Sequence, residues 1–264
     1  MAQPRVLVLR APGANCDLES AHAFERAGAV CELLHVNRLL ESPHAIRDFQ
    51  ILCVPGGFSY GDDLGAGRIL GSQIRQHLDG AMREFKAAGK LILGICNGFQ
   101  ILMKSGLLLA DDPEHGPPAT LTWNAGGRFE CRWVTLRTAG SPSVFFAGID
   151  TLYLPMAHAE GRVMTRDAAV LDELRRGRQI ALTYANADGS VPPDGTLLPF
   201  PLNPNGAVAN IAGLCDPTGR VCGLMPHPER HIDPTQHPRW TRRREQPAAG
   251  DGLRVFQNAV EYFR

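Results

Sequence analysis

The feature that most constrains this chain is a cysteine between two glycines, directly after an apolar run. The run is residues 91–95, and Cys96 follows it, with Gly94 two positions before the cysteine and Gly98 two positions after. This is the nucleophile-elbow pattern G-x-S-x-G with cysteine in place of serine. A strand turns sharply into a helix there, and flanking glycines prevent side-chain collisions around the strained nucleophile. The pattern predicts an α/β sheet with a reactive thiol at one strand end.

Residues 99–103 are apolar enough to continue as the first turns of a helix. Cys96 would then lie at a helix N-terminus, where the partial positive charge favours a thiolate over a thiol. The alternative is a buried structural cysteine, because free cysteines are often buried. A base placed to act on the thiol would favour the catalytic interpretation.

His227 is the candidate base among nine histidines. It follows the apolar run 221–225 in the sequence His227-Pro228-Glu229. In an extended chain, positions i and i+2 project to the same side, and the neighbouring prolines favour extended geometry. Glu229 is therefore predicted to orient one imidazole nitrogen while the other faces Cys96, as in a nucleophile–base–orienter triad. The alternative is a solvated turn at a strand end.

A third segment supplies a candidate oxyanion site. The apolar run 51–54 is followed by Pro55, Gly56 and Gly57. Glycines allow a backbone N–H to approach a ligand closely. We expect the N–H groups of Gly57 and Asn97 to hold a developing oxyanion, as in elbow-type hydrolases. A turn that merely ends a strand is the alternative.

Composition limits the function classes. The 264 residues carry 27 basic and 27 acidic side chains, so no global field favours nucleic acid or an anionic membrane. Seven cysteines without a C-x-x-C pair favour a reducing compartment over disulfides or a zinc site, and no metal site is predicted. No apolar run approaches the roughly 20 residues that span a bilayer. The sequence also lacks a signal-peptide layout. We expect a cytoplasmic protein.

The order of elements predicts one α/β domain over residues 1–264. Asp17 is a candidate N-cap for a helix over 17–28, and residues 69–88 carry an amphipathic helical stripe. Alternating strands and helices in the first half favour an open, mostly parallel, flavodoxin-like sheet flanked by helices. A closing helix is expected at 253–263. The expected strands are 5–9, 30–36, 51–54, 91–95, 128–136, 143–146, 152–154, 180–184, 207–212 and 220–225.

These segments together resemble the Cys-His-Glu glutamine amidotransferases. The family's G-x-C-x-G-x-Q motif is matched by Gly94, Cys96, Gly98 and Gln100, and its H-P-E motif begins at His227. The branch of this family that serves purine biosynthesis is matched by further segments in order. They are 13–19, 55–62, 96–100, 157–162, 203–206 and 225–230.

The resemblance implies the class I glutamine amidotransferase fold and a glutaminase activity. Cys96 would form a γ-glutamyl thioester with glutamine, His227 and Glu229 would serve as acid/base pair, and Gln100 would contact the substrate. The ammonia would pass to a synthetase subunit that uses ATP and Mg²⁺ to convert formylglycinamide ribonucleotide to its amidine. A small third subunit is left open. This chain lacks the phosphate-binding pattern G-x-x-x-x-G-K-[ST], so no cofactor is expected in it.

Two stretches depart from the family pattern: 186–202, rich in proline and glycine, and the arginine-rich 239–244. Three other functions stay open: an amidotransferase for another acceptor, a non-catalytic binding module on the same fold, and a cysteine hydrolase acting alone.

Residues 58–68 are the expected partner interface, with Phe58 and Tyr60 as aromatic anchors. The alternative is a solvated loop whose aromatic side chains fold back onto the domain. The stretch 239–244 is the second candidate for the interface.

Overall fold

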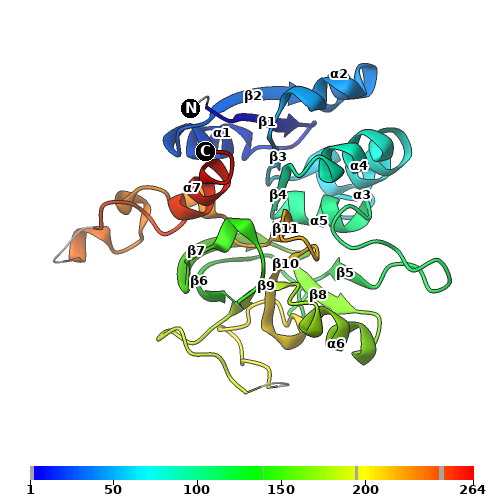
Figure 1. The fold of residues 1–264 in the computed structure, drawn as a ribbon. Helices are drawn as coiled ribbons and strands as arrows, with labels where there is room; N and C mark the ends of the chain where they lie inside the picture. The colour runs from blue at the N-terminus through cyan, green and yellow to red at the C-terminus, as the bar shows by residue number, and fades with distance from the viewer. Residues whose placement is uncertain (1–2, 139, 194–195, 244–246) are drawn as a thin grey trace.

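A computed structural model describes residues 3–138, 140–193, 196–243 and 247–264 of the chain (Figure 1). Its centre is a nine-stranded sheet, and a separate pair of strands, β5 and β8, lies beside it. The strands are β1 (Arg5–Arg10), β2 (Val30–His35), β3 (Ile51–Val54), β4 (Leu91–Ile95), β5 (Ala119–Thr122), β6 (Glu130–Thr138), β7 (Thr151–His158), β8 (Arg162–Thr165), β9 (Ile180–Tyr184), β10 (Ile211–Cys215) and β11 (Val221–Leu224).

The large sheet has a parallel part and an antiparallel part. Its strand order is β2-β1-β3-β4-β11-β10-β9-β6-β7. Strands β2, β1, β3, β4 and β11 run parallel, whereas each further pairing from β11 to β7 is antiparallel. The central strands β3, β4 and β11 are buried along their whole length. Because these three strands run parallel, their carboxyl ends meet at one edge of the sheet, where open α/β sheets place their ligand-binding and active sites.

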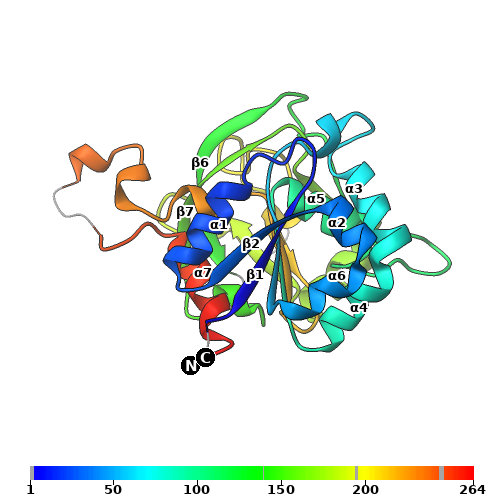
Figure 2. The ribbon, with the colours of Figure 1, turned by 90° about the horizontal axis from the view of Figure 1, so that it is seen from above.

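Helices cover both faces of the parallel part. Figure 2 shows α1 and α7 on one side of the sheet and α3, α4 and α5 on the other. Phe24 of α1 packs edge-on against Phe256 of α7, with ring centroids 4.9 Å apart. No helix of the described residues is long and apolar enough to cross a membrane. The α-helices are α1 (Asp17–Arg26), α2 (Val36–Glu41), α3 (Arg68–Gln73), α4 (Asp79–Ala87), α5 (Asn97–Lys104), α6 (Ala168–Arg176) and α7 (Leu253–Glu261).

The predicted fold class, an open α/β sheet flanked by helices with an elbow at Cys96, is confirmed. The helix expected over 69–88 is present but interrupted by a π-helical turn, Ile74–Leu78, between α3 and α4. Asp17 is not the N-cap of α1: Cys16 takes that position, and Asp17 lies in the first turn, paired with Arg10 at 2.6 Å.

Two of the expected strands are wrong or displaced. Residues Val144–Phe146 form a 3₁₀ turn that buries Phe145 and Phe146, because a short apolar run can fill a buried turn as well as a strand. The strand expected at 207–212 begins only at Ile211. Before it, Ala209 and Asn210 have positive φ angles of 48° and 57°, and such left-handed residues break a strand. The short strands β5 and β8 and the helix α6 were not predicted.

Candidate active site

Cys96 lies at the sharp turn between β4 and α5, with φ 51° and ψ −104°. This backbone conformation is costly for any residue with a side chain and is typical of functional sites. Neighbouring glycines make it possible. A Cβ on Gly98 would lie 1.8 Å from the carbonyl oxygen of Val54, and one on Gly94 would lie 2.7 Å from the carbonyl oxygen of Gly98. Residue 96 thus has the strained geometry of a nucleophile elbow.

The Cys96 side chain is nearly buried, with 5% of its surface exposed. Its thiol donates a weak hydrogen bond to the carbonyl oxygen of Ala157, 3.7 Å away on β7. The backbone N–H of Cys96 donates to the carbonyl oxygen of Leu224 at 2.7 Å, which ties the elbow to the end of β11. The strand that leads to His227 is therefore the direct neighbour of the strand that leads to Cys96.

His227 and Glu229 form a buried pair just beyond β11. The imidazole Nδ1 donates to Glu229 Oε1 at 2.6 Å, and both side chains are almost fully buried. The extended conformation predicted for the segment holds only at His227, because Pro228–Arg230 is a 3₁₀ turn. This turn, rather than a continuous strand, brings the Glu229 carboxylate to the Nδ1 atom of the imidazole. The backbone N–H of His227 donates to Pro155 on β7 at 2.8 Å and fixes the start of the turn.

The electrostatics of the pair favour an imidazolium. Burial by itself lowers the pKa of His227, but the Glu229 carboxylate and the sulfur of Cys96 outweigh it and raise the pKa well above its ordinary value. The other ring nitrogen, Nε2, is buried and has no hydrogen-bond partner among the described residues. It is therefore free to exchange a proton with Cys96 or a substrate. Catalytic hydrogen bonds of this kind often form fully only when substrate is bound.

Gly57 and Asn97, the predicted oxyanion donors, lie on the two sides of the elbow: Gly57 lines the cavity at Cys96, and Asn97 directly follows Cys96. Gly57 has φ 135°, and a Cβ there would lie 2.6 Å from the backbone nitrogen of Asn15. No hydrogen bond between described residues uses the backbone N–H of Gly57 or that of Asn97. Asn97 is the first residue of α5, directly after Cys96, and Gly57 lies in the loop after β3, the neighbour of β4 in the sheet. Two free N–H groups at such a position can stabilise negative charge on a substrate oxygen.

Gln100 and the side chain of Asn97 hold the neighbouring loop. Asn97 Oδ1 accepts from the backbone N–H of Ser59 at 3.1 Å, and Asn97 Nδ2 donates to Gln100 Oε1 at 2.9 Å. Gln100 Nε2 donates to the backbone oxygen of Glu160. Both ends of the Gln100 side chain thus have protein partners. The expected contact of Gln100 with substrate stays a prediction.

A cavity of about 260 Å³ opens beside the cysteine. Sequence reasoning missed three polar residues at it: Asp62, His158 and Glu160. Asp62 was expected only in the partner interface 58–68, and 157–162 supported only the family resemblance, because nothing in these segments indicated that the fold would bring them together. The cavity is lined by Gly57, Phe58, Gly61, Asp62, Ala66, Cys96, Gln100, Trp123, Ala157, His158, Ala159 and Glu160.

The polar groups of the cavity differ in charge. Burial raises the pKa of Asp62, and the Glu160 carboxylate adds to this rise. Burial and the nearby His227 lower the pKa of His158 to about 3, so this imidazole is neutral at pH 7. Glu160 Oε2 accepts a hydrogen bond from the backbone N–H of Ala66 at 3.3 Å. The cavity therefore offers carboxylates and a neutral imidazole, a setting suited to a ligand that carries an ammonium group.

A second, larger hollow of about 390 Å³ lies along β9 and includes Arg137, Arg175 and Arg178. It contains none of the predicted site residues. Arg137 and Arg175 are already paired with Asp150 and Asp172. The smaller cavity is the candidate active site, because the strained cysteine lines it.

Comparison with known proteins agrees with the fold and the site. Residues 3–263 match the model of the CobB/CobQ-like glutamine amidotransferase domain, and the chain belongs to this family. It is 45% identical over 270 residues to phosphoribosylformylglycinamidine synthase subunit PurQ of Dehalococcoides mccartyi, covering 100% of this chain and 99% of that protein. The PurQ subunit of Methanococcus maripaludis is 42% identical over 270 residues, covering 98% and 97%.

Comparison with solved structures also agrees with the fold described above. A chain in the structure of PurLQS from Thermotoga maritima superimposes with a TM-score of 0.72 and 30% identity, covering all of both chains. A glutamine amidotransferase of the same organism, at 17% identity and a TM-score of 0.52 over 92% of this chain and 82% of that chain, shares the fold.

Proposed function

We propose that this chain is the glutaminase subunit of phosphoribosylformylglycinamidine synthase. It would hydrolyse glutamine and pass ammonia to a synthetase that makes formylglycinamidine ribonucleotide in purine biosynthesis. The observation that carries the proposal is the strained Cys96 beside the buried His227–Glu229 pair at adjacent strand ends. Full-length relatives named PurQ, at 45% and 42% identity, support the choice of acceptor.

The first chemical step follows from the positions of three groups. The Cys96 thiolate attacks the carbon of the glutamine side-chain amide, and the amide oxygen takes the negative charge. The N–H groups of Gly57 and Asn97 would hold that oxygen, since neither has a partner among the described residues. Asp62 and Glu160 offer carboxylates to the α-ammonium group of glutamine from the cavity wall.

His227 would then move protons in both halves of the reaction. As an imidazolium it gives a proton from Nε2 to the leaving nitrogen, the carbon–nitrogen bond breaks, and ammonia leaves a γ-glutamyl thioester on Cys96. The neutral ring next takes a proton from water, which attacks the thioester and releases glutamate and the thiol. Glu229, bonded to Nδ1 at 2.6 Å, keeps the ring oriented and stabilises its charged form.

The ammonia must reach the acceptor without entering bulk water, because ammonia in neutral water is mostly protonated and unreactive. A synthetase subunit would bind against this chain, and a small third subunit is consistent with the PurLQS structure it resembles. ATP and Mg²⁺ belong to that synthetase, and no cofactor is proposed for this chain. We place the complex in the cytoplasm.

Reconstitution with the synthetase tests this function against the alternatives. We expect the purified chain to be labelled at Cys96 by the glutamine mimic 6-diazo-5-oxonorleucine, and the assembled complex to form the amidine from glutamine. Labelling and ammonia release without amidine formation would indicate an amidotransferase for another acceptor. Absence of labelling at Cys96 would indicate a binding module or a cysteine hydrolase of another class.

A further inference from the structure

A second cysteine, Cys16, lies against the candidate base. It is 1% exposed and occupies the N-cap of α1. The Cys16 sulfur, one ring nitrogen of His227 and one carboxylate oxygen of Glu229 all lie within 4.8 Å of one another. A Cβ on Gly56 would be 3.2 Å from the Cys16 sulfur and 2.8 Å from His227 Cε1. The sulfur and the imidazole edge therefore occupy the space that glycine leaves at position 56.

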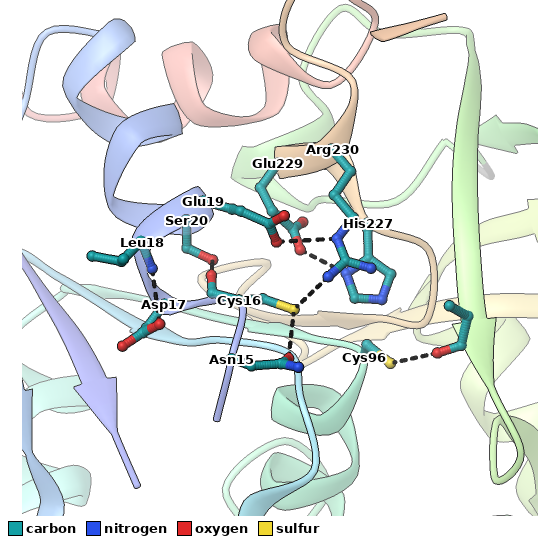
Figure 3. A network of polar contacts seen from close by, with 11 residues as sticks. Asn15, Cys16, Asp17, Leu18, Glu19, Ser20, Cys96, His227, Glu229 and Arg230 are labelled. Carbon is teal, nitrogen blue, oxygen red and sulfur yellow. Dashed lines mark hydrogen bonds and ion pairs between the residues drawn. The ribbon is translucent and has the colours of Figure 1, made fainter. Parts of the chain in front are cut away.

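The sulfur of Cys16 is fixed by its own hydrogen bonds. Arg230 Nη2 donates to it at 3.1 Å, and the Cys16 thiol donates to Asn15 Oδ1 at 3.4 Å. Arg230 is held in turn by Glu19 at 3.0 Å. Figure 3 shows the Cys16 and Cys96 sulfurs at different edges of the His227 ring. The ring thus has a fixed sulfur on the side that does not face the nucleophile.

The same residue connects the base to the oxyanion loop. The backbone N–H of Cys16 donates to the carbonyl oxygen of Gly56 at 3.2 Å, and Phe58 N–H donates to Gly13 at 2.9 Å. Residues 13–16 therefore hold the loop that carries Gly57, while the Cys16 sulfur lies within 4.8 Å of a ring nitrogen of His227. A displacement of Cys16 would therefore disturb both the surroundings of His227 and the loop that carries Gly57.

Several charged or titratable groups face His227. Burial lowers the pKa of His227, whereas Glu229, then Cys96, then Cys16 raise it. Arg230 lies beyond the Cys16 sulfur, and the neutral His158 lies at the end of β7. Burial raises the pKa of Cys16 itself, so it remains a thiol at pH 7 and is not a second nucleophile. Its sulfur accepts from Arg230 at 3.1 Å, whereas the imidazole donates to Glu229 and leaves Nε2 without a partner among the described residues, so the sulfur acts on the ring through its position beside it.

On the basis of the proposed glutaminase function, we propose that Cys16 is a positioning residue for His227. Its sulfur, held by Arg230, fixes the imidazole against Glu229 and so keeps Nε2 in place for its proton transfers. It does not touch glutamine. Nothing in the triad pattern indicates such a role.

Three substitutions in the assembled complex separate an acceptor from a space-filling side chain. Cys16→Ala and Cys16→Val both remove the acceptor, but valine keeps most of the volume. We expect both to lower kcat for glutamine about tenfold, the rate equivalent of one charge-assisted hydrogen bond, with little change in KM. Cys16→Ser, whose hydroxyl accepts from Arg230, should retain most of the activity. Cys222→Ala, which removes another fully buried thiol, is the matched control.

A second measurement does not depend on the acceptor reaction. Alkylation of Cys96 by iodoacetamide, followed on its own peptide by mass spectrometry, reports the thiolate as a function of pH. In Cys16→Val the half-maximal pH should move upward, because a ring displaced from Glu229 is less stable as an imidazolium, whereas Cys222→Ala should match the wild type. Wild-type kcat and an unshifted profile in Cys16→Val would overturn the proposal. A wild-type complex unable to use glutamine would instead overturn the proposed function, and the alkylation profiles would still decide the role of Cys16.

Discussion

At the scale of single residues, the candidate active site depends on the positive charge of the His227 imidazolium, which burial disfavours. His227 and Glu229 are both nearly inaccessible, and an isolated charge there would be costly. Their 2.6 Å contact compensates for the lost hydration and keeps the ring charged. Nε2 is left without a partner among the described residues, a cost that a catalytic role explains.

His227→Ala should lower glutamine turnover by at least about 10²-fold, the usual scale for a general acid–base residue. Glu229→Gln should cost less, because the ring loses charge stabilisation but keeps a hydrogen-bonding neighbour. Steady-state kinetics of the assembled complex measure both. Unchanged turnover in Glu229→Gln at every pH would remove Glu229 from the acid/base pair.

The raised pKa of His227 also predicts how stability depends on pH. A group whose pKa is raised in the folded state stabilises the fold fully below its unfolded pKa, about 6.5 for histidine. That contribution is lost as pH rises through the raised value. The difference in melting temperature between wild type and Glu229→Gln should therefore be larger near pH 6 than in alkaline solution. A difference independent of pH would contradict the charged pair.

The sequence was sufficient to select Cys96, His227 and Glu229, because each belongs to a short motif at the end of an apolar run. It was not sufficient for Asp62, His158, Glu160 and Cys16. They come from a 3₁₀ turn, the end of β7 and the residues just beyond it, and the N-cap of α1, whose relative positions depend on tertiary packing, so local patterns carry no information on their contacts.

At the scale of elements, glycines determine how closely the elbow approaches its neighbours. Gly98, in the first turn of α5, packs on the last residue of β3, and the backbone of Val54 leaves no room for a side chain. The same closeness brings the β3 loop with Gly57 beside Cys96. Backbone atoms cannot move aside as flexible side chains do.

Gly98→Ala should destabilise the fold by about 1–3 kcal/mol or more, the usual cost of overpacking a core. Gly80→Ala is a matched control, because a Cβ at this helical position meets nothing within 4 Å. It should change stability by less than about 1 kcal/mol, in the stabilising direction. Denaturant unfolding measures both. Equal effects would show that the elbow tolerates a side chain at position 98.

Element prediction succeeded where periodicity or a strong apolar run was present, as in β3, β4 and α4. It failed at 143–146, where the run is as short as a buried turn. It also failed at Ala209 and Asn210, whose left-handed backbone is supported by distant bonds such as Leu198 N–H to Asn210 Oδ1 at 2.8 Å.

At the scale of the whole molecule, exposed apolar side chains lie near the cavity. Phe58 is 45% exposed, although its ring stacks loosely on Phe129 at 6.4 Å, and Leu64 is 65% exposed. Tyr60, expected as a second anchor, instead folds back and donates its hydroxyl to Gln73 at 2.9 Å. In the second candidate, 239–244, Trp240–Arg242 forms a 3₁₀ turn, and Arg244 lies outside the described residues. Of the stretch 186–202, residues 194–195 also lie outside them.

A Phe58→Ala, Leu64→Ser double variant should keep the fold but bind the synthetase more weakly, with ammonia released instead of being incorporated. The reason is that exposed apolar side chains are suitable interface anchors, and Phe58 itself lines the cavity. Val191→Ser, at a similarly exposed position along the second hollow, is the control. Binding affinity and the ratio of amidine formed to glutamine consumed are the measurements. Wild-type affinity and a wild-type ratio in the double variant would contradict this interface and favour residues 239–243 instead.

The most direct test of the account is to replace the nucleophile and supply ammonia from outside. Cys96→Ala in the assembled complex should abolish amidine synthesis from glutamine but leave synthesis from added ammonia close to wild type, because Cys96 acts only on the nitrogen donor. Both rates can be measured in one preparation. Equal loss with both donors, or activity with glutamine that survives the substitution, would contradict the assignment of Cys96 as the nucleophile of a glutaminase subunit.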